Sequence, residues 1–598
     1  MTGPDPRHRR PVPPAGGSPL RASVSRRPGD PSESGHYAYQ SLQVAYREQS
    51  EDVSWQIAEN PAYTLMLDGH LYLRSATTLD AQANLNALLD AISVTTLEKG
   101  LDTIGGGIFN LLILDKRRRV LTVLGDRLGL MPLYYVEDAD GVHLSGNSFA
   151  FRDRFGLSEA AVVEFLKYGY LPFAPSLFED VQRLLPGQML TISLDSRRVS
   201  RSTPRVFEFK PLAHRIHDLP EAVALLDGAL ERFFDRCSRG SYTVELRGDD
   251  ASRLTASRLR PFAPTLLSFD PPYSSAASRV LRFAERLGLP ADIRTLPVDL
   301  LETSAIRLDQ RFRLALGMEN ADLLHLCQVL PYGTPDYYVD SFLGDDLLGG
   351  AFYQLAGDSV LGYLFGDVAF NTSVREITTY QDHLYNGPRT LSDAELSGIL
   401  HPEYEVWFLN AARGVLEINR NAGHTHEDYL ESLALYTHVR NHRAGRLVCA
   451  AAQTGAVSPF LDYDVQQVCF DTDKSLRADR QLRDAYLRRH APEIAGDPVW
   501  ATDNAILDRR RLYRLRQVIS PSRRVGFPEP TPVERLSERT VARRFRRRGA
   551  RSELREAAVR PPADMPAAIV ARIEELAGEG RLHPRLYLRY LSLLCLAG

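Results

Sequence analysis

Histidines, cysteines and paired acidic residues are the side chains in this sequence whose types could do chemistry. His438 and His442 lie four residues apart in a stretch with helical periodicity, so both rings could face one metal ion. No third ligand lies near them in the sequence, which favours packing over metal binding. The five cysteines include no C-x-x-C pair and no Cys/His spacing typical of zinc. Asp345 and Asp346 follow Gly344, and such a pair is typical either of a functional loop or of a helix start, because Asp caps a helix N-terminus.

Four segments of the chain must position these residues. Residues 1–36 are rich in Pro, Arg, Ser and Gly, so we predict a disordered tail. Residues 37–205 contain short β-type runs separated by turn residues, which predicts an antiparallel, sheet-rich domain. Residues 218–500 alternate strands with helices, which predicts a parallel sheet whose ligands bind beyond the carboxyl ends of its strands. We expect residues 501–598 to form a basic, helical C-terminal extension.

Composition and charge limit the class of protein. The 598 residues include 72 basic and 75 acidic side chains, a net charge of −3, and 44% are hydrophobic, which is typical of a soluble globular protein. No apolar run approaches the roughly 18 residues of a membrane-spanning helix, and the N-terminus has no apolar core of a signal peptide. These features predict a cytoplasmic protein with no membrane contact. Residues 501–560 hold 17 Arg and 7 acidic residues, which we interpret as a solvated face in preference to a surface for an anionic partner.

Glycine, proline and aromatic residues form a dense pattern in the first domain. Residues 107–109 read GIF and residues 125–135 read GDRLGLMPLYY. Together with LDGHLY at residues 67–72 and the stretch at residues 176–187, this pattern resembles the glutaminase domain of asparagine synthetases. The resemblance implies an α+β sandwich of the N-terminal nucleophile (Ntn) hydrolase type, the class II glutaminase fold. The matching residues are turn and packing residues, so they report the fold and not the chemistry.

The catalytic nucleophile of that family is missing from this sequence. The resemblance implies a cysteine exposed at the N-terminus, which attacks glutamine. Here Thr2 holds the second position and no cysteine precedes Cys237. The family's R-G-P-D element, which holds glutamine, is also not recognisable. We therefore predict that the glutaminase-like domain lacks its nucleophilic Cys and does not hydrolyse glutamine.

A glycine loop with an acidic pair follows the first predicted strand of the second domain, where residues 244–253 read VELRGDDASR. This resembles the S-G-G-x-D-S loop of the asparagine synthetase ATP-pyrophosphatase domain, a HUP (adenine nucleotide α-hydrolase-like) fold. In that loop backbone N–H groups cradle the phosphates of ATP and an Asp holds magnesium. The resemblance implies that Gly248 and Ser252 contact ATP. Ala251 replaces the metal-binding Asp, so we predict that Asp250, one position earlier, holds Mg²⁺; otherwise the loop keeps its shape and loses its ligand.

The acidic pair that follows Gly344 gains a function from the same resemblance. Residues 343–350 read LGDDLLGG, which resembles the family's G-x-D-E-L-F-G-G. This implies that Gly344 lies against the nucleotide, that Asp345 handles magnesium pyrophosphate and that Asp346 acts near the adenylate. The helix start remains the alternative.

Two later stretches resemble the family and have lost its charged residues. Residues 455–462 read GAVSPFLD and resemble E-x-R-x-P-F-L-D, with Gly455 and Val457 in place of Glu and Arg. Residues 479–485 read DRQLRDA and resemble K-x-L-L-R-x-A, with Asp479 in place of the phosphate-binding Lys. Arg480 is the neighbour that we expect to substitute for that Lys.

The adenine site of the family corresponds to a strand further upstream. Ser268 and Phe269 occupy the matching positions and are predicted to contact the cofactor. An ordinary core strand is the alternative.

Two functions follow from the resemblance. The first is an ATP-dependent, amide-forming ligase of the asparagine synthase type, in which Mg²⁺ and ATP adenylate a carboxylate that ammonia or an amine then attacks. β-Lactam synthetases and lasso-peptide cyclases also lack the cysteine and use an internal amine of the substrate. The expected partners are a small-molecule or peptide carboxylate, a biosynthetic partner enzyme and a second copy in a homodimer.

The alternative is a catalytically inactive asparagine synthetase-like protein that acts as a binding or scaffold protein. The residues at positions 251, 455, 457 and 479 favour it, because they remove a metal ligand, an ion pair and a cation from one site. Nucleic-acid binding through the basic segment ranks last, because no recognised module supports it.

Overall fold

The computed structural model describes most of the chain, in several segments. These are residues 20–25, 36–39, 42–46, 56–139, 141–202, 209–237, 240–246, 249–270, 276–295, 317–319, 336–349, 434–451, 454–477, 481–495, 532–556 and 561–594, with selected positions between 391 and 432. Within these segments no helix is both long enough and apolar enough to cross a membrane.

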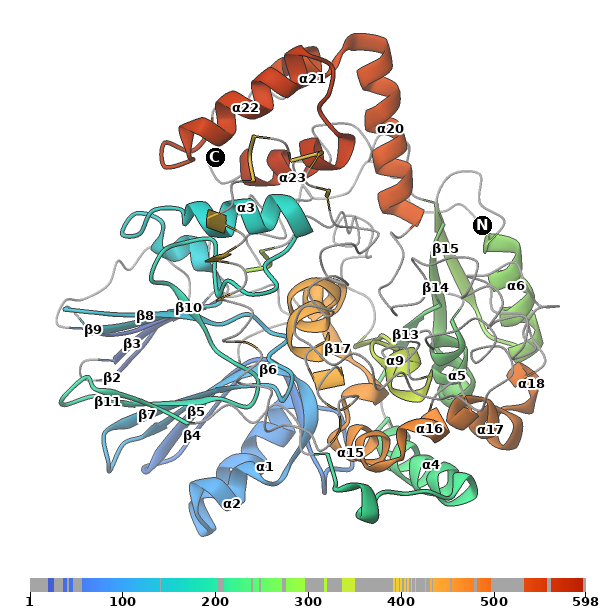
Figure 1. Ribbon diagram of the computed structural model, residues 1–598. Helices are drawn as coiled ribbons and strands as arrows, with labels where there is room; N and C mark the ends of the chain where they lie inside the picture. Colours follow the sequence, from blue (N-terminus) through green and yellow to red (C-terminus); the bar gives the residue numbers. More distant parts are fainter. Residues whose placement is uncertain are drawn as a thin grey trace, which may run out of the picture.

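Two antiparallel sheets pack face to face in the first half of the chain (Figure 1). The first sheet has the order β10 (Gln182–Arg183), β8 (Tyr134–Asp138), β9 (Gly141–Ser145), β1 (Leu20–Ser25), β3 (Leu42–Tyr46) and β2 (His36–Tyr39). The second has the order β12 (Val199–Arg201), β11 (Met189–Ser193), β7 (Val120–Gly125), β6 (Ile104–Asp115), β5 (Tyr63–Leu73) and β4 (Gln56–Glu59). The predicted antiparallel, sheet-rich domain is confirmed.

Helices cover both outer faces of this sandwich. The inner faces share an apolar core that includes Met66, Leu112 and Leu144. Helix α1 (Ala81–Val94) packs Leu85 and Leu88 against the outer face of the second sheet, next to α2 (Leu97–Leu101). Helix α3 (Glu159–Tyr168) lies on the outer face of the first sheet, preceded by the 3₁₀ turn Ser148–Phe151. The domain therefore has four layers, α-β-β-α.

The boundary of the first domain differs from the sequence prediction. The predicted disordered tail, residues 1–36, contains strand β1, which pairs with β3 on one side and β9 on the other. The sequence of β1, LRASVS, alternates apolar and polar residues, as a strand does. Its backbone hydrogen bonds come from strands far along the chain, so composition alone could not predict them.

A five-stranded parallel sheet forms the centre of the second half. Its order is β15 (Ala291–Thr295), β14 (Thr265–Asp270), β13 (Tyr242–Glu245), β16 (Tyr337–Val339) and β17 (Gly455–Val457). Every neighbouring pair in this sheet is parallel, which confirms the predicted parallel sheet. The strand order reverses between β13 and β16, and ligands of such sheets bind in the crevice at this reversal.

Helices surround the parallel sheet and connect its strands. Those that precede β16 are the 3₁₀ turn Leu212–His214, α4 (Leu219–Asp235), α5 (Asp250–Leu259), the 3₁₀ turn Arg260–Phe262 and α6 (Ala276–Leu287). After β16 come α9 (Gly344–Gly349), the π-helix η6 (Leu435–Arg443) and α14 (Gly445–Ala451). After β17 come the 3₁₀ turn η7 (Pro459–Leu461), α15 (Tyr463–Asp471), α16 (Lys474–Arg477), α17 (Gln481–His490) and α18 (Pro492–Ala495).

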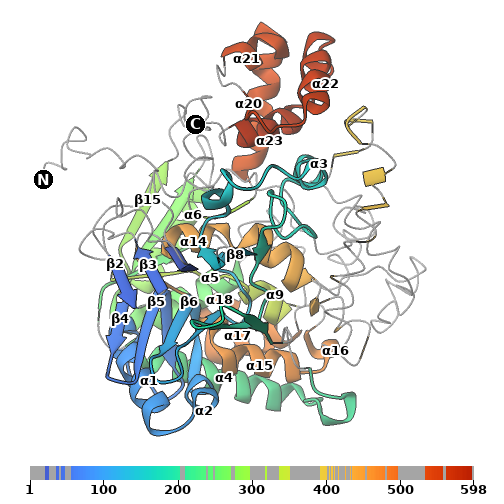
Figure 2. The ribbon, with the colours of Figure 1, turned by 90° about the vertical axis from the view of Figure 1, so that its left-hand side faces the viewer.

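Four C-terminal helices pack on the sandwich domain, against α3, and not on the parallel-sheet domain. They are α20 (Pro532–Arg548), α21 (Ala550–Glu556), α22 (Ala567–Gly578) and α23 (Pro584–Leu594), and they stand above α3 (Figure 2). Leu586 and Leu591 of α23 share a core with Phe165 of α3. The basic segment, residues 501–560, is described from Pro532 to Glu556, and Arg543, Arg546, Arg547 and Arg548 of α20 are exposed.

The two halves of the chain share one apolar core. Its members include Tyr72, Ile108 and Leu130 from the sandwich, together with Val244 and Val339 from the parallel sheet. A β-bridge also joins Gly106 to Asp462, and the backbone N–H of Arg127 donates to the Tyr463 hydroxyl at 3.0 Å. The sandwich therefore packs directly against the domain that carries the predicted nucleotide site.

Candidate functional site

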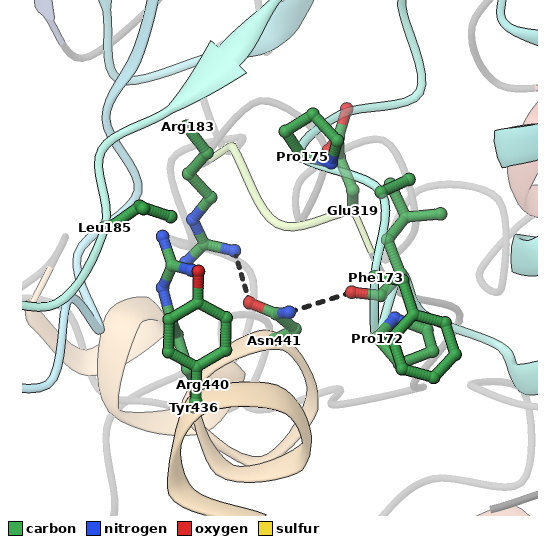
Figure 3. Close-up of a pocket in the computed structure, with 11 residues that line it drawn as sticks. Pro172, Phe173, Pro175, Arg183, Leu185, Glu319, Tyr436, Arg440 and Asn441 are labelled. Carbon is green, nitrogen blue, oxygen red and sulfur yellow. Dashed lines mark hydrogen bonds between the residues drawn. The ribbon is translucent and has the colours of Figure 1, made fainter. Parts of the chain in front are cut away.

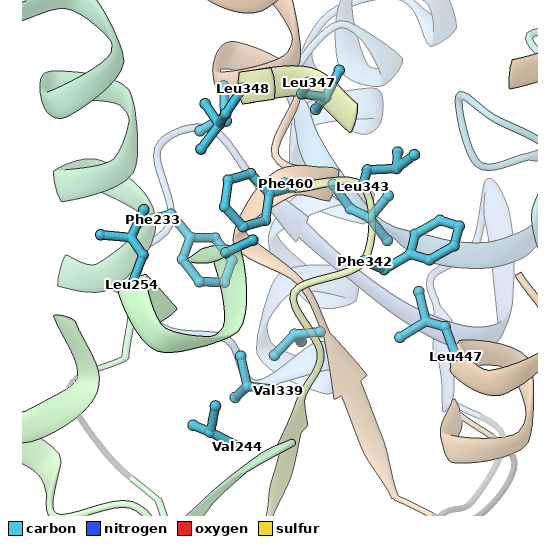
Figure 4. Close-up of a cluster of buried hydrophobic side chains, with 14 of the residues drawn as sticks. Phe233, Val244, Leu254, Val339, Phe342, Leu343, Leu347, Leu348, Leu447 and Phe460 are labelled. Carbon is cyan, nitrogen blue, oxygen red and sulfur yellow. The ribbon is translucent and has the colours of Figure 1, made fainter. Parts of the chain in front are cut away.

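The predicted site residues of the second domain meet at one edge of the parallel sheet. Helix α5 follows β13 and helix α9 follows β16, and these are the two strands that flank the reversal of strand order. The helices begin in contact, because a Cβ atom added to Gly344 would lie 2.4 Å from Cβ of Ala251 and 2.5 Å from the Phe460 ring. Leu343, Leu347 and Phe460 pack beneath this junction (Figure 4). Close packing at this junction therefore leaves no room for a side chain at position 344.

The N-terminus of α5 is capped by the side chain of Asp249, the residue before the helix. Asp249 is the N-cap residue, and its Oδ1 accepts a hydrogen bond from the Ser252 backbone N–H at 2.7 Å. The Ser252 hydroxyl donates to the backbone carbonyl of Asp249 at 3.1 Å. A backbone N–H that the sequence predicts to meet a phosphate is therefore bonded to a carboxylate within the loop. Gly248 lies outside the described residues.

Asp250 is held by two buried arginines. Its Oδ1 forms an ion pair with Arg253, and its Oδ2 lies 2.7 Å from Nη1 of Arg483. Burial alone lowers the pKa of Arg483, but the charges of Asp250, Asp484 and Asp345 offset this, and the net shift is upward. Arg483 therefore stands within electrostatic range of both predicted magnesium ligands.

This arrangement does not fit the predicted magnesium ion at Asp250. A metal ligand needs lone pairs directed at the ion, and the arginines occupy both oxygens of this carboxylate. The positive charge that Mg²⁺ would bring is supplied by guanidinium groups. Among the residues that the structure describes, no cluster of three His, Cys, Asp or Glu could hold a metal.

Asp346 is also paired with an arginine. Its Oδ2 lies 2.5 Å from Nη1 of Arg443, the last residue of η6, and only 4% of Asp346 is exposed. Glu245, at the carboxyl end of β13, forms an ion pair with Arg446 and accepts a hydrogen bond from the Tyr338 hydroxyl. Asp346 and Glu245 are therefore both paired with arginines of the segment that contains η6 and α14.

A buried network of charged residues, which the sequence did not predict, contacts the backbone of α9. Arg477 donates from Nε to the backbone carbonyl of Leu347 at 2.7 Å and forms an ion pair with Glu431 at 2.5 Å. Lys474 also pairs with Glu431. Burial raises the pKa of Glu431, but the two cations outweigh it and the net shift is downward. The spacing of Lys474 and Arg477 on one helical turn was the only sequence signal for this network, and their partner lies in a distant segment.

The third motif of the second domain is structural in this chain. Gly455 and Val457 lie on β17, and a Cβ atom at Gly455 would stand 2.7 Å from the backbone carbonyl oxygen of Asp336. Asp462 caps α15 through Asp464 and Val465 and forms a buried ion pair with Arg236 at 3.0 Å. The described residues of this stretch therefore hold β17 and α15 in place.

The structure describes only some of the remaining predicted cofactor residues. Ser268 and Phe269 lie on β14, next to β13, and Ser268 is buried. They stand near the carboxyl end of the sheet, and their contact with an adenine ring stays a prediction. Arg480 and Asp479 lie outside the described residues.

The sandwich domain shows why its signature residues are needed. The carboxylate of Asp126 accepts backbone hydrogen bonds from Leu128, Leu130 and Met131 at 3.0–3.1 Å and so fixes the turn that follows β7. Burial raises the pKa of Asp126, and these hydrogen bonds partly offset the rise. Thr2 lies outside the described residues. The pattern at residues 125–135 is therefore a packed turn, which agrees with its interpretation as turn and packing residues.

His438 and His442 pack against one another. Their rings stack with centroids 4.9 Å apart, and both contact Tyr170 of the sandwich domain. Their preferred interpretation as packing residues fits this geometry, since they fill the junction between the two halves of the chain.

Comparison with known proteins relates one part of the chain to a family. Residues 70–202 match the family model of the glutamine amidotransferase domain. Among solved structures, the chain is similar to an allosteric regulatory enzyme of purine biosynthesis (12% identity, 42% of this chain and 66% of that chain, TM-score 0.19). It is also similar to glutamine phosphoribosylpyrophosphate amidotransferase from B. subtilis complexed with ADP and GMP (13% identity, 46% of this chain and 60% of that chain, TM-score 0.20).

These structural similarities are too low to carry an argument, and this chain spans less than two thirds of either structure. No curated protein matches the sequence. The family match agrees with the four-layer sandwich and with the turn residues around Asp126. The N-terminal part of the chain is therefore a relative of the glutamine amidotransferase domain of the Ntn-hydrolase type.

Proposed function

We propose that this chain is an amidotransferase-family protein whose second domain is of the asparagine synthetase type. The chain acts as a binding or scaffold protein and does not adenylate a carboxylate. The observation that carries the proposal is the ion pair between Arg483 and Asp250, at 2.7 Å. An enzyme that adenylates a carboxylate needs Mg²⁺ to neutralise the charge that develops on the phosphates. Here a buried guanidinium neutralises the carboxylates instead.

The start of α5 supports the same proposal. Asp249 places a negative charge where the triphosphate of ATP would approach, and it already accepts the Ser252 N–H. A phosphate at this position would meet repulsion and would have to displace an internal hydrogen bond. The sandwich domain adds no glutamine chemistry in this proposal, because no cysteine precedes Cys237 in the sequence.

A second candidate is the ATP-dependent, amide-forming ligase. The convergence of α5 and α9 at the reversal of strand order favours it, because a nucleotide would bind at this place in a HUP-type sheet. In this candidate Asp345 holds magnesium pyrophosphate, Asp346 acts near the adenylate, and Arg483 must leave Asp250 when the nucleotide arrives. The two candidates differ in whether the purified protein binds magnesium ATP.

Calorimetric titration with magnesium ATP separates the two candidates. We expect no saturable heat from the wild-type protein at about millimolar nucleotide, where an affinity worth some 4 kcal/mol would be detected. Binding in the micromolar range that disappears in Asp345→Ala, followed by pyrophosphate release with any carboxylic acid, would overturn the proposal and establish the ligase.

A variant tests the part of the proposal that concerns Arg483. Arg483→Ala removes the guanidinium from Oδ2 of Asp250 and its positive charge from the surroundings of Asp345, so that Oδ2 becomes available to a divalent cation. We expect this variant to bind Mn²⁺ at least about tenfold more tightly than the wild type in calorimetry, a difference of about 1.4 kcal/mol. Arg488→Ala, an exposed position on the same helix, is the matched control and should behave as the wild type. Equal Mn²⁺ affinity in all three proteins would show that Arg483 does not stand in for a metal.

A further inference from the structure

A cavity lies between the two halves of the chain, away from the edge of the parallel sheet. It encloses about 50 Å³ and is partly open to solvent, and Figure 3 shows side chains that line it. The sandwich domain contributes residues 171–175, Arg183 and Leu185, and the π-helix η6 contributes Tyr436, Arg440 and Asn441. The enclosed part is large enough for a carboxylate group, and the rest of a ligand would occupy the opening.

Two arginines meet at this cavity. Arg440 is 5% exposed and donates to the backbone carbonyls of Gly129 at 3.1 Å and Leu184 at 2.5 Å. Arg183 donates to the Asn441 side-chain oxygen at 3.0 Å and to the same Gly129 carbonyl at 3.3 Å. Because both guanidinium groups bond to one carbonyl oxygen, the two positive charges lie side by side. Burial, and then the charge of Arg183, lower the pKa of Arg440 to about 9.

Neither arginine forms an ion pair with a carboxylate of the residues that the structure describes. Glu319 also lines the cavity, but its carboxylate accepts hydrogen bonds from Ser148 at 2.7 Å, Ser176 at 3.0 Å and the Leu177 N–H at 2.9 Å. The Nε atom of Arg183 is buried and has no hydrogen-bond partner. Burying Arg440 next to the half-buried Arg183 costs free energy, and a bound anion would offset that cost.

Another part of the cavity wall is apolar. Leu171, Pro172, Phe173 and Leu185 line the cavity together with the arginines. The loop that carries Phe173 is fixed in place, because its backbone N–H donates to the buried carboxylate of Glu164 at 2.6 Å. A free inorganic anion would leave these walls uncovered. An organic acid would use both parts of the cavity.

We propose that this cavity binds a small carboxylic acid with an apolar or aromatic portion, whose carboxylate lies against Arg183 and Arg440 and whose apolar portion lies against Phe173 and Leu185. Arginine suits this role because its planar fork donates two parallel hydrogen bonds to a carboxylate. The inference goes beyond the proposed function, since a different set of residues lines the cavity. Loss of this site and loss of nucleotide binding are therefore measured separately.

The test uses phenylacetate as the probe and the full chain as the protein. We expect saturable binding in calorimetry with a dissociation constant of about 1 mM or tighter. Phenylacetamide, which has the same ring and no charge, should bind at least about tenfold more weakly, because hydrogen bonds to a charged group are stronger. Inorganic phosphate should also bind more weakly than phenylacetate.

Two variants at one position decide whether the arginines are the receptor. Leu185→Glu places a carboxylate inside the cavity, so the protein supplies its own anion and phenylacetate affinity should fall at least about tenfold. Leu185→Gln has nearly the same size as Leu185→Glu and no charge; it removes part of the apolar wall, so affinity should fall, but clearly less than in Leu185→Glu. Arg183→Gln should lose binding, whereas Arg201→Gln, at a partly exposed arginine away from the cavity, should not. Circular dichroism confirms that each variant is folded.

Three results would overturn the inference. They are the absence of saturable phenylacetate binding to the folded wild type, equal binding of phenylacetamide, and equal loss in Leu185→Gln and Leu185→Glu. Tighter binding of inorganic phosphate than of phenylacetate would also contradict it, because the apolar wall would then play no part.

Discussion

Arginine side chains determine the character of the edge of the parallel sheet. Arg253, Arg483 and Arg443 each neutralise a carboxylate that the sequence predicted to face a ligand. Buried pairs of this kind are costly to break, because the remaining charge has no water around it. The sequence showed the acidic residues and their order. It could not show that their partners come from α5, α17 and η6, because those contacts form only in three dimensions.

Close packing at Gly344 gives a first prediction. Gly344→Ala should lower the free energy of unfolding by about 2 kcal/mol, because the added methyl group collides with Ala251 and Phe460. The measurement is urea unfolding at neutral pH. The double variant Gly344→Ala with Ala251→Gly should recover part of the loss, since it removes one of the two collisions.

Gly578→Ala is the matched control for this prediction. A Cβ atom at Gly578 meets nothing within 4 Å at the end of α22, so the change should be within about 0.5 kcal/mol or stabilising. Equal destabilisation at both glycines would show that packing at the α5–α9 junction is not the cause.

Glu164 gives a prediction on pH. Burial raises the pKa of this fully buried carboxyl from 4.5 to about 8, although the N–H groups of Phe173 and Ala174 partly offset the rise. Between pH 4.5 and 8 the folded protein keeps a proton that the unfolded chain has released. The stability that this group contributes is therefore fully present below pH 4.5 and is lost as the pH rises through 8.

Glu164→Gln removes this dependence. The free energy of unfolding of the wild type minus that of the variant should fall across this range by an amount on the order of 5 kcal/mol, at about 1.4 kcal/mol per pKa unit. Urea unfolding at several pH values measures it. Glu179→Gln, at an exposed position, should give a difference that does not change with pH. A constant difference for Glu164→Gln as well would show that Glu164 titrates normally.

At the scale of elements, the sequence predicted the types of structure better than their partners. The period-two runs gave the strands of the sandwich, and the strand–helix alternation gave the parallel sheet. The placement of α20–α23 on α3 had no sequence signal, because an amphipathic helix shows which face is apolar and not what covers it. The π-helical form of η6 was also not predicted, since its apolar spacing is close to that of an α-helix.

The contact between α23 and α3 gives a further prediction. Arg589 donates to the backbone carbonyls of Leu166 at 2.8 Å and Lys167 at 2.5 Å, at the end of α3 where Gly169 has a φ of 81°. These carbonyls have no partner within their helix, so Arg589 caps α3 from a distance. Arg589→Ala should lower the free energy of unfolding by about 2 kcal/mol and increase amide hydrogen exchange in residues 159–168.

Arg581→Ala is the control at the element scale. Arg581 forms an exposed ion pair with Glu579, and such pairs contribute little to stability. Unchanged exchange in α3 after Arg589→Ala would show that the C-terminal helices only cover this helix and do not stabilise its end.

At the scale of the whole molecule, the shared core predicts that the two halves unfold together. Tyr72, Ile108 and Leu130 of the sandwich belong to the same apolar cluster as the strands of the parallel sheet. Arg236 adds to this junction, because it pairs with Asp462 and donates to the backbone carbonyl of Arg74. We expect one calorimetric transition for the full chain. Two separate transitions would show that the sandwich and the parallel-sheet domain are independent units.

The backbone around Gly455 also limits which residues this position accepts. A Cβ atom here would stand 2.7 Å from the Asp336 carbonyl oxygen. Strands β16 and β17 are paired at this point, with Tyr337 opposite Gly455. Any side chain at position 455 would therefore have to push the two strands apart, and this chain would acquire new chemistry more readily at a surface position than at this one.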